Sequence, residues 1–271
     1  MYCLIAKTKF KLDFVSPLMN KQIEKYQVSN IDRDYIHIES KIVREYDLPT
    51  VLPSIKSKYY NIYYEGDIIK QVQFNEDNSV YGVITYSDKH CLIEMDEGEV
   101  NRREYLLSEY ALFYYVLKYQ DAIMIHSSSI KYNDSGILFI AKSGTGKSTQ
   151  ARLWKNYYDV IQINDDKNIL ILEDDNLMIY GNPYSGKSCI DENISTKLTH
   201  LVFIYQNKEN VISSITKRQQ MLLLMPQITN SSFMYNKEKW NRLTDKLLLE
   251  KGYLLGCTIS KEAVDLLKSV L

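Results

Sequence analysis

Residues 141–149 read Ala-Lys-Ser-Gly-Thr-Gly-Lys-Ser-Thr, and they directly follow an apolar run, Gly-Ile-Leu-Phe-Ile, at positions 136–140. An apolar run that enters a glycine-rich turn predicts a strand, followed by a loop whose backbone N–H groups turn inward around phosphate oxygens. In such a loop Lys147 can reach the β- and γ-phosphates, and the Ser148 hydroxyl can ligate Mg²⁺. Residues 149–155 can form a helix that directs its N-terminal N–H groups and positive dipole end at the same phosphates. The stretch therefore indicates a phosphate-binding loop (P-loop), and we expect ATP and Mg²⁺ as its ligands.

One position of this loop departs from the consensus G-x-x-x-x-G-K-[ST]. The consensus has glycine where this chain has Ala141, and a positive φ at an alanine would be costly. The alternative is a glycine-rich turn that binds nothing, but the strand before it and the helix after it favour the P-loop. The residues that we expect to bind the nucleotide are Ser143, Gly144, Thr145, Gly146, Lys147, Ser148 and Thr149.

Two adjacent aspartates, Asp165 and Asp166, follow the predicted strand at 160–163. One helix and one return strand separate them from Lys147, so they should emerge beside the P-loop. One carboxylate there can hold Mg²⁺, and the other can accept a proton from an incoming hydroxyl. We assign Ser148 and Asp166 as the metal ligands, although the sequence leaves open which aspartate is the base and which is the ligand. The alternative is that the two aspartates form only a polar turn.

A histidine and a later turn complete the candidate site. His126 ends a short strand just before the P-loop strand, so its imidazole can lie near the phosphates, although a packing role stays open. The segment 180–187 is rich in turn formers and ends on a cation. It can act as a substrate or phosphate clamp, or it can be an ordinary surface loop. We expect catalytic roles for His126, Lys147, Asp165 and Asp166, and substrate contacts from Tyr184, Ser185, Gly186 and Lys187.

The composition is that of an ordinary globular protein. The chain has 271 residues and a net charge of −1, which gives no reason to expect nucleic acid as a partner. Its four cysteines are far apart and form no C-x-x-C pair, so we expect reduced thiols and neither a zinc site nor a disulfide framework. The sequence shows neither a run of 18 apolar residues nor a signal-peptide core. We therefore expect a cytoplasmic protein without a membrane partner, and a homo-oligomer stays compatible with the sequence.

The chain divides by pattern into three parts. Residues 1–100 contain short β-type runs separated by turn clusters, which predict a β-rich N-terminal domain built as an antiparallel meander. Apolar residues at spacings of three and four predict a packing helix at 102–120 that connects the two larger parts, and we assign 101–120 to this connection. Residues 121–271 mix predicted strands and helices around the P-loop, as a nucleotide-binding domain does. Among them we predict strands at 122–128 and 130–132 and a helix at 237–251. The predicted class is α/β (α+β).

The C-terminal half resembles the HPr serine kinase/phosphorylase-like family, which has the P-loop fold of phosphoenolpyruvate carboxykinase. The likeness extends from about residue 123 to 187 and is weaker to residue 271. It depends on three ordered motifs: a histidine followed by small residues at 125–128, the loop at 141–148, and the aspartate pair at 165–166. The segment Gly-Asn-Pro-Tyr-Ser-Gly-Lys at 181–187 is similar to that of small HPr-kinase-related proteins found with peptide natural-product genes.

This resemblance implies an ATP-dependent kinase that phosphorylates a Ser or Thr hydroxyl of a protein or precursor peptide. Residues 1–100 do not resemble the N-terminal domain of HPr kinase, and no Arg-Gly-Leu-Gly segment follows Asp166, which argues against HPr itself as the substrate and against a reverse phosphorylase activity. Two alternatives stay open. One is a small-molecule kinase or carboxykinase-like enzyme, and the other is a non-catalytic nucleotide-binding module that recognises a peptide.

Overall fold

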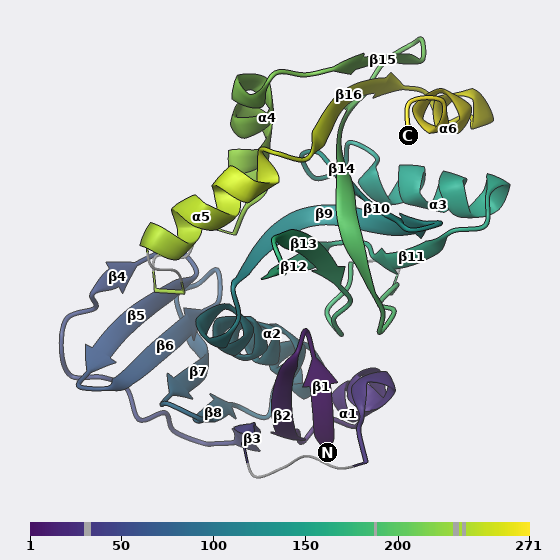
Figure 1. Ribbon diagram of the computed structural model, residues 1–271. Coiled ribbons are helices and arrows are strands. Elements are labelled where there is room, and N and C mark those ends of the chain that lie inside the picture. Colours follow the sequence, from purple (N-terminus) through teal and green to yellow (C-terminus); the bar gives the residue numbers. More distant parts are fainter. Residues whose placement is uncertain (30–33, 187–188, 230–232, 235–236) are drawn as a thin grey trace. The chain divides into compact units, whose positions relative to one another are not determined.

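The computed structural model describes residues 1–29, 34–186, 189–229, 233–234 and 237–271 (Figure 1). The chain divides into two compact units, Met1–Tyr119 and Gln120–Leu271. The described residues form two eight-stranded sheets and six α-helices, so the protein belongs to the mixed α/β class. Within these ranges no helix is both long and apolar enough to cross a membrane.

The first unit is built on a mixed sheet with the strand order β1-β2-β3-β8-β7-β6-β5-β4. Neighbouring strands from β4 to β8 pair antiparallel, as the predicted meander requires. Strands β1 and β2 also pair antiparallel, but the meander prediction is wrong around β3, which pairs parallel with both β2 and β8. The strands of this unit are β1 Tyr2–Ile5, β2 Thr8–Asp13, β3 Ile36–Ile42, β4 Ile55–Lys56, β5 Tyr60–Glu65, β6 Ile68–Phe74, β7 Val80–Tyr86 and β8 His90–Met95.

A helix that the sequence analysis did not predict explains the first parallel pair. Helix α1 (Pro17–Ile23) and the 3₁₀ turn η1 (Glu24–Tyr26) lie between β2 and β3. The Ser16 side chain accepts a hydrogen bond from the Met19 N–H, and Pro17 occupies the first helical turn, which are ordinary signals for a helix start. A parallel return needs a crossover of this kind, whereas a tight turn would force an antiparallel neighbour.

Helix α2 (Val100–Tyr119) closes the first unit. It begins two residues before the predicted start and packs against β3, β7 and β8. The fully buried Glu104 carboxylate accepts hydrogen bonds from the backbone N–H groups of Val15 (2.9 Å) and Ser16 (2.8 Å). These bonds satisfy two donors where the chain leaves β2, and they hold the start of α1 beside α2.

Two histidines pair on neighbouring strands of the first sheet. His37 on β3 lies opposite His90 on β8, with ring centroids 5.3 Å apart. His37 Nε2 lies 2.8 Å from an Asp13 carboxylate oxygen, and His90 Nε2 lies 2.9 Å from a Glu39 carboxylate oxygen. These partly exposed polar contacts connect β2, β3 and β8 across the sheet.

The second unit has a sheet in the order β10-β9-β12-β13-β14-β16-β15, with β11 paired to β9. Two long strands, β9 and β14, are each shared between several partners. Residues 122–126 of β9 pair with β12 and residues 127–132 pair with β10, while residues 195–197 of β14 pair with β13 and residues 198–203 pair with β10. The strands of this unit are β9 Ala122–Tyr132, β10 Ser135–Ile140, β11 Ile161–Asn164, β12 Lys167–Glu173, β13 Asn176–Tyr180, β14 Ser195–Gln206, β15 Val211–Ser214 and β16 Lys251–Cys257.

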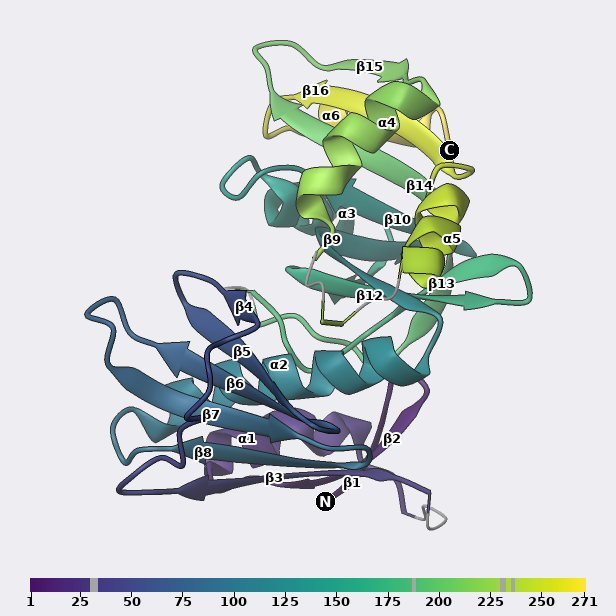
Figure 2. The ribbon, with the colours of Figure 1, turned by 90° about the vertical axis from the view of Figure 1, so that its left-hand side faces the viewer.

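Helices cover both faces of this sheet, and β10 shows why. Its side chains alternate between two hydrophobic clusters, so that Ile137 and Phe139 belong to one and Leu138 and Ile140 belong to the other. Helices α3 (Lys147–Tyr157) and α6 (Lys261–Lys268) contribute to the first cluster. Helices α4 (Lys217–Leu224) and α5 (Lys237–Leu247), with the 3₁₀ turn η2 (Met225–Gln227), contribute to the second. Figure 2 shows α4 and α5 in front of the sheet. A strand covered on both faces is continuously apolar, as this one is.

Most predicted elements of the second unit are observed. The two strands predicted at 122–128 and 130–132 form one continuous strand, β9, in which residues 122–126 pair with β12 and residues 127–132 pair with β10. The helix predicted at 237–251 ends at Leu247, because Lys251 already begins β16.

Candidate functional site

The glycine-rich loop connects β10 to α3. Gly144 and Gly146 have φ values of 79° and 120°, a region that L side chains rarely adopt. Gly146 is the N-cap of α3, so the helix begins at Lys147 with its first N–H groups facing the loop. Ala141 is not among the non-glycine residues with positive φ in the described ranges. The one departure from the consensus therefore brings no left-handed backbone strain.

A cavity of about 560 Å³ lies beside this loop. It brings together residues from β9, the loop, α3, the segment after β11 and the turn at 186. One of them, Arg152 of α3, is a site residue that the sequence analysis did not identify. The lining residues are His126, Ser143, Gly144, Gly146, Lys147, Ser148, Thr149, Arg152, Asp165, Asp166 and Gly186.

Three of the predicted site residues that the structure describes do not line this cavity. Thr145 lines a second cavity that also borders the loop. Tyr184 is 1% exposed and its backbone carbonyl accepts a hydrogen bond from Asn164, so it packs beneath the site. Ser185 is half-buried outside the cavity lining, and Lys187 lies outside the described residues.

His126 connects Lys147 to Asp166. Its Nε2 lies 3.0 Å from the Lys147 ammonium nitrogen, and its Nδ1 lies 2.9 Å from Asp166 Oδ1. A lysine ammonium can only donate, so Nε2 must accept and the ring proton must be on Nδ1, which donates it to the carboxylate. The geometry therefore assigns a neutral imidazole protonated on Nδ1, between a cation and an anion. His126 has a specific contact at each nitrogen and is more than a packing residue.

Burial and nearby charges set the pKa values of Lys147 and Asp166. Burial lowers the pKa of Lys147, and the negative charge of Asp166 acts in the opposite direction. Burial acts to raise the pKa of Asp166, but the hydrogen bond from His126 and the nearby positive charges of Lys167 and Lys147 outweigh it, so that the pKa is lowered. Lys147 also donates a 3.0 Å hydrogen bond to the Ala141 carbonyl, which fixes the ammonium at the base of the loop.

Asp165 makes different contacts from its neighbour. Its Oδ1 accepts a 2.6 Å hydrogen bond from the Gly186 N–H, and its backbone carbonyl accepts bonds from the hydroxyls of Ser128 (3.0 Å) and Ser148 (3.3 Å). Asp165 as a whole residue is buried (4% exposed), whereas the Asp166 side chain is 29% exposed. The two carboxylates are therefore distinguished by environment: Asp165 is held between Ser148 and Gly186, and Asp166 is held by His126.

Gly186 fits closely over the two aspartates. A Cβ at this position would lie 3.2 Å from Asp165 Oδ2 and 3.2 Å from Asp166 Cβ, which is tighter than most contacts of real Cβ atoms. The close approach permits the hydrogen bond from Gly186 N–H to Asp165. It gives a structural reason for glycine at position 186.

Asn164 organises the turn that carries both aspartates, and the sequence analysis missed it. The side chain is fully buried, and its oxygen accepts hydrogen bonds from the N–H groups of Asp166 (2.9 Å) and Lys167 (3.0 Å). Its amide nitrogen donates to the carbonyls of Asn182 (3.3 Å) and Tyr184 (3.0 Å). The signal available in the sequence was an Asn immediately before Asp-Asp, because Asn side chains often bond the backbone two residues ahead.

Replacement of Asn164 by alanine is expected to destabilise the protein by about 3 kcal/mol, because it leaves buried backbone donors and acceptors without partners. Chemical denaturation monitored by circular dichroism would measure this change. The matched control is Asn176→Ala, whose side chain donates only an exposed bond to the Asp174 carbonyl and whose loss is expected to cost no more than about 0.5 kcal/mol. Equal stabilities of the two variants would show that Asn164 does not organise the turn.

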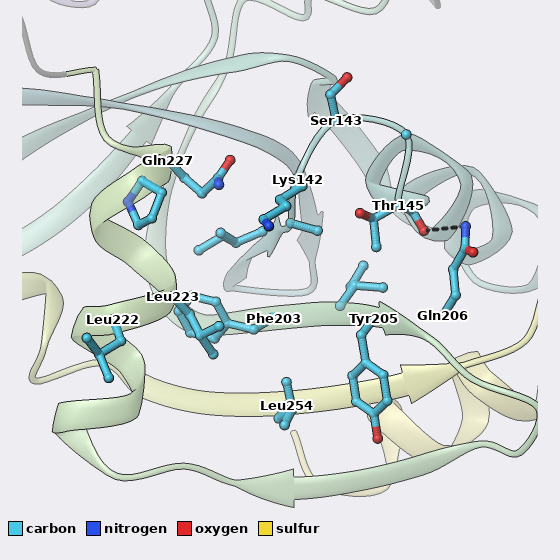
Figure 3. Close-up of a pocket in the computed structure, with 15 residues that line it drawn as sticks. Lys142, Ser143, Thr145, Phe203, Tyr205, Gln206, Leu222, Leu223, Gln227 and Leu254 are labelled. Atoms are coloured by element: carbon cyan, nitrogen blue, oxygen red, sulfur yellow. Dashed lines mark hydrogen bonds between the residues drawn. The ribbon is translucent and has the colours of Figure 1, made fainter.

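A second cavity, of about 770 Å³, also borders the loop (Figure 3). Its lining includes Lys142, Ser143, Gly144 and Thr145 of the loop, and it continues over the end of β14 and the middle of β16 to α4 and η2. Most side chains in the wall are apolar, among them Phe203, Leu222, Leu223 and Leu254. The Gln206 side chain donates a 3.5 Å hydrogen bond to the Thr145 carbonyl and joins β14 to the loop.

Comparison with known proteins gives little beyond the site itself. No protein-family model matches the chain, and no curated protein matches it. Among solved structures, the chain has a distant likeness to the HPr(Ser) kinase/phosphatase from Coxiella burnetii. The two are 8% identical, the match covers 54% of this chain and 87% of the other, and the TM-score is 0.33. At so low a TM-score, the functional argument depends on the contacts and cavities of this chain.

Proposed function

We propose that this protein is an ATP-dependent kinase that transfers the γ-phosphoryl group to a hydroxyl group, a Ser or Thr of a protein or peptide. One observation carries the proposal: the cavity beside the glycine-rich loop gathers Lys147, Ser148, Asp165, Asp166 and His126 at the N-terminus of α3. Phosphoryl transfer needs donors and cations for the phosphates, oxygen ligands for Mg²⁺ and a carboxylate for the incoming hydroxyl. All of these groups line a single cavity here.

The loop and α3 are suited to hold a triphosphate. The left-handed glycines leave the backbone free to turn its N–H groups toward an anion, and the helix N-terminus adds a positive dipole end. Lys147 supplies a positive charge that is largely removed from water, where its attraction to phosphate is strengthened. Arg152, one turn further along α3, supplies a second cation at the same cavity.

The oxygen donors of the cavity fit Mg²⁺. The Ser148 hydroxyl and the carboxylates of Asp165 and Asp166 are hard oxygen ligands, which this ion prefers. We propose that Ser148 and one aspartate hold the ion. When bound, it neutralises charge that develops on the phosphate oxygens.

In the proposed reaction, the acceptor oxygen forms a new bond to the γ-phosphorus while the bond between that phosphorus and the β,γ-bridging oxygen breaks. ADP leaves with the bridging oxygen, and the acceptor hydroxyl proton passes to a carboxylate of the site. Asp166 suits this role because it is the more exposed of the two aspartates. Its lowered pKa makes it a weak base, which agrees with a loose transition state in which the carboxylate mainly orients the hydroxyl. His126 keeps Asp166 in place through its Nδ1–H.

The acceptor class is supported by the resemblance of residues 181–187 to small HPr-kinase-related proteins found with peptide natural-product genes, some of which phosphorylate a Ser on a precursor peptide. The test is incubation with γ-labelled ATP, Mg²⁺ and two acceptor sets, Ser/Thr peptides and small hydroxylated metabolites, followed by mass spectrometry of the products. Phosphate esters on peptides are expected. If phosphate esters form only on small molecules, the protein is a small-molecule kinase and not a peptide kinase. ATP binding without transfer to either set would favour the non-catalytic module.

A further inference from the structure

The two cavities beside the glycine-rich loop adjoin each other. Ser143 and Gly144 line both of them, so one stretch of backbone forms a wall of each. Their chemistry is opposite. The smaller cavity contains two carboxylates and two cations among its lining residues, whereas the larger is walled mainly by aliphatic and aromatic side chains. A ligand that spans both must be anionic at one end and flat or apolar at the other.

The larger cavity has a floor, a side wall and a polar rim. Phe203 of β14 and Leu254 of β16 form the floor, and Leu223 of α4 forms the side wall (Figure 3). Figure 3 also shows Lys142 across the cavity from Leu254. Leu222 and Leu223 are 67% and 40% exposed, which is unusual for neighbouring leucines on a helix that has a buried side.

We propose that this larger cavity receives the heteroaromatic base of the nucleotide whose phosphates are held by Lys147 and α3. The proposal rests on the proposed function and adds the second half of the ligand site. A cavity of about 770 Å³ with apolar walls and few polar groups is typical of a small-molecule site. A base presents flat faces that pack on apolar side chains, and Lys142 can add a cation–π contact to the same ring.

Polar side chains at the rim can recognise the edge of the base. Gln206 and Gln227 both line the cavity and carry amides, which can donate and accept together. Gln206 is already joined to Thr145 of the loop. Contact between a base and Gln206 would therefore act on the same loop that holds the phosphates. An amide side chain can accept a hydrogen bond from the amino group of adenine and donate one to a ring nitrogen, so a purine with an amino group is the favoured base.

The experiment compares two ligands, ATP and inorganic tripolyphosphate, by isothermal titration calorimetry with Mg²⁺ present. Leu254→Trp fills the floor of the larger cavity, and Leu223→Gln makes its wall polar. Neither residue lines the smaller cavity. Leu249→Trp is the matched control, because Leu249 is 62% exposed and lines neither cavity. Circular dichroism confirms the fold of each variant, and Leu223→Gln serves if the tryptophan variant does not fold.

We expect Leu254→Trp and Leu223→Gln to weaken ATP binding by about tenfold and to leave tripolyphosphate binding within about twofold of wild type. The control should change neither. An equal loss for both ligands, or no loss for ATP, would overturn the base site. A raised KM for the acceptor with unchanged ATP affinity would assign the cavity to the acceptor and would also overturn it. Wild-type protein that binds neither ligand would instead refute the proposed function.

Discussion

Replacement of Lys147 by alanine is expected to lower kcat for phosphoryl transfer by about 10³-fold. Lys147 and Arg152 are the cations among the described residues that line the smaller cavity, and Lys147 is the buried one. Because Lys147 is only 6% exposed, its charge acts with little screening by water. The substitution also removes the donor that faces His126 Nε2 and the Ala141 carbonyl. Single-turnover measurement with labelled ATP would separate this loss of chemistry from a loss of binding.

The control for this variant is Lys155→Ala, in the last turn of the same helix, where the lysine is exposed and lines neither cavity. Its kcat should stay within about twofold of wild type, as for surface substitutions that touch no special feature. We do not expect a loss of folding stability to explain the lower kcat of Lys147→Ala. Because burial lowers the pKa of Lys147, holding its ammonium in the fold opposes folding at neutral pH, and this penalty fades as pH rises toward the usual lysine value of 10.5. A Lys147→Ala protein that is folded and fully active would contradict the proposed site.

Replacement of Asp166 by asparagine is expected to lower kcat by about 10²–10³-fold. The amide can present an N–H to His126 Nδ1, which would move the ring proton to Nε2. That proton would then face the Lys147 ammonium, so that two donors oppose each other across the present 3.0 Å contact. The variant also loses the carboxylate that we propose for the acceptor hydroxyl. Steady-state kinetics with a phosphorylated acceptor as product would measure the loss.

Asp165→Asn is the informative comparison, because Asn can still accept the hydrogen bond from Gly186 N–H, and the bond from His126 Nδ1 to Asp166 stays in place. A fall in kcat for Asp166→Asn with a raised Mg²⁺ requirement for Asp165→Asn would assign Asp166 as the base and Asp165 as the metal ligand. The reverse pattern would exchange these roles. Unchanged kcat in both variants would refute catalysis by this pair.

The pH dependence of stability gives an independent check on Asp166. Its pKa in the fold is lowered from 3.8, so its contribution to stability is present above that value and is lost as pH falls through the lower folded pKa. The difference in unfolding free energy between wild type and Asp166→Asn should therefore be constant above about pH 5 and should shrink in acid. A difference that grows in acid would show that His126 does not stabilise the ionised carboxylate.

Local pattern was enough to predict many elements of the second unit. Strand β10, the loop and α3 were predicted because an apolar run, glycines and a helix-forming segment follow one another without interruption. The parallel pairs of the first unit were not predicted, because α1 is only seven residues long and gives a weak periodic signal. The single strand β9 was divided in two, because the serines at 127–129 are polar but buried, and they bond to Asn164, Asp165 and Asn168.

The sequence by itself determined the chemical inventory of the site: a glycine-rich loop with Lys147 and Ser148, an aspartate pair, and a histidine before them. These residues follow from motif and order, because local backbone geometry needs glycine, and phosphate and metal chemistry need particular side chains. Only the tertiary structure decided which atoms meet. His126 directs Nδ1 to Asp166 and Nε2 to Lys147. Asn164 holds the turn that carries the two aspartates, and an apolar cavity adjoins the loop. Contacts of this kind join strands that are distant in sequence, and they depend on how β9, β11 and β14 pair, which no local pattern specifies.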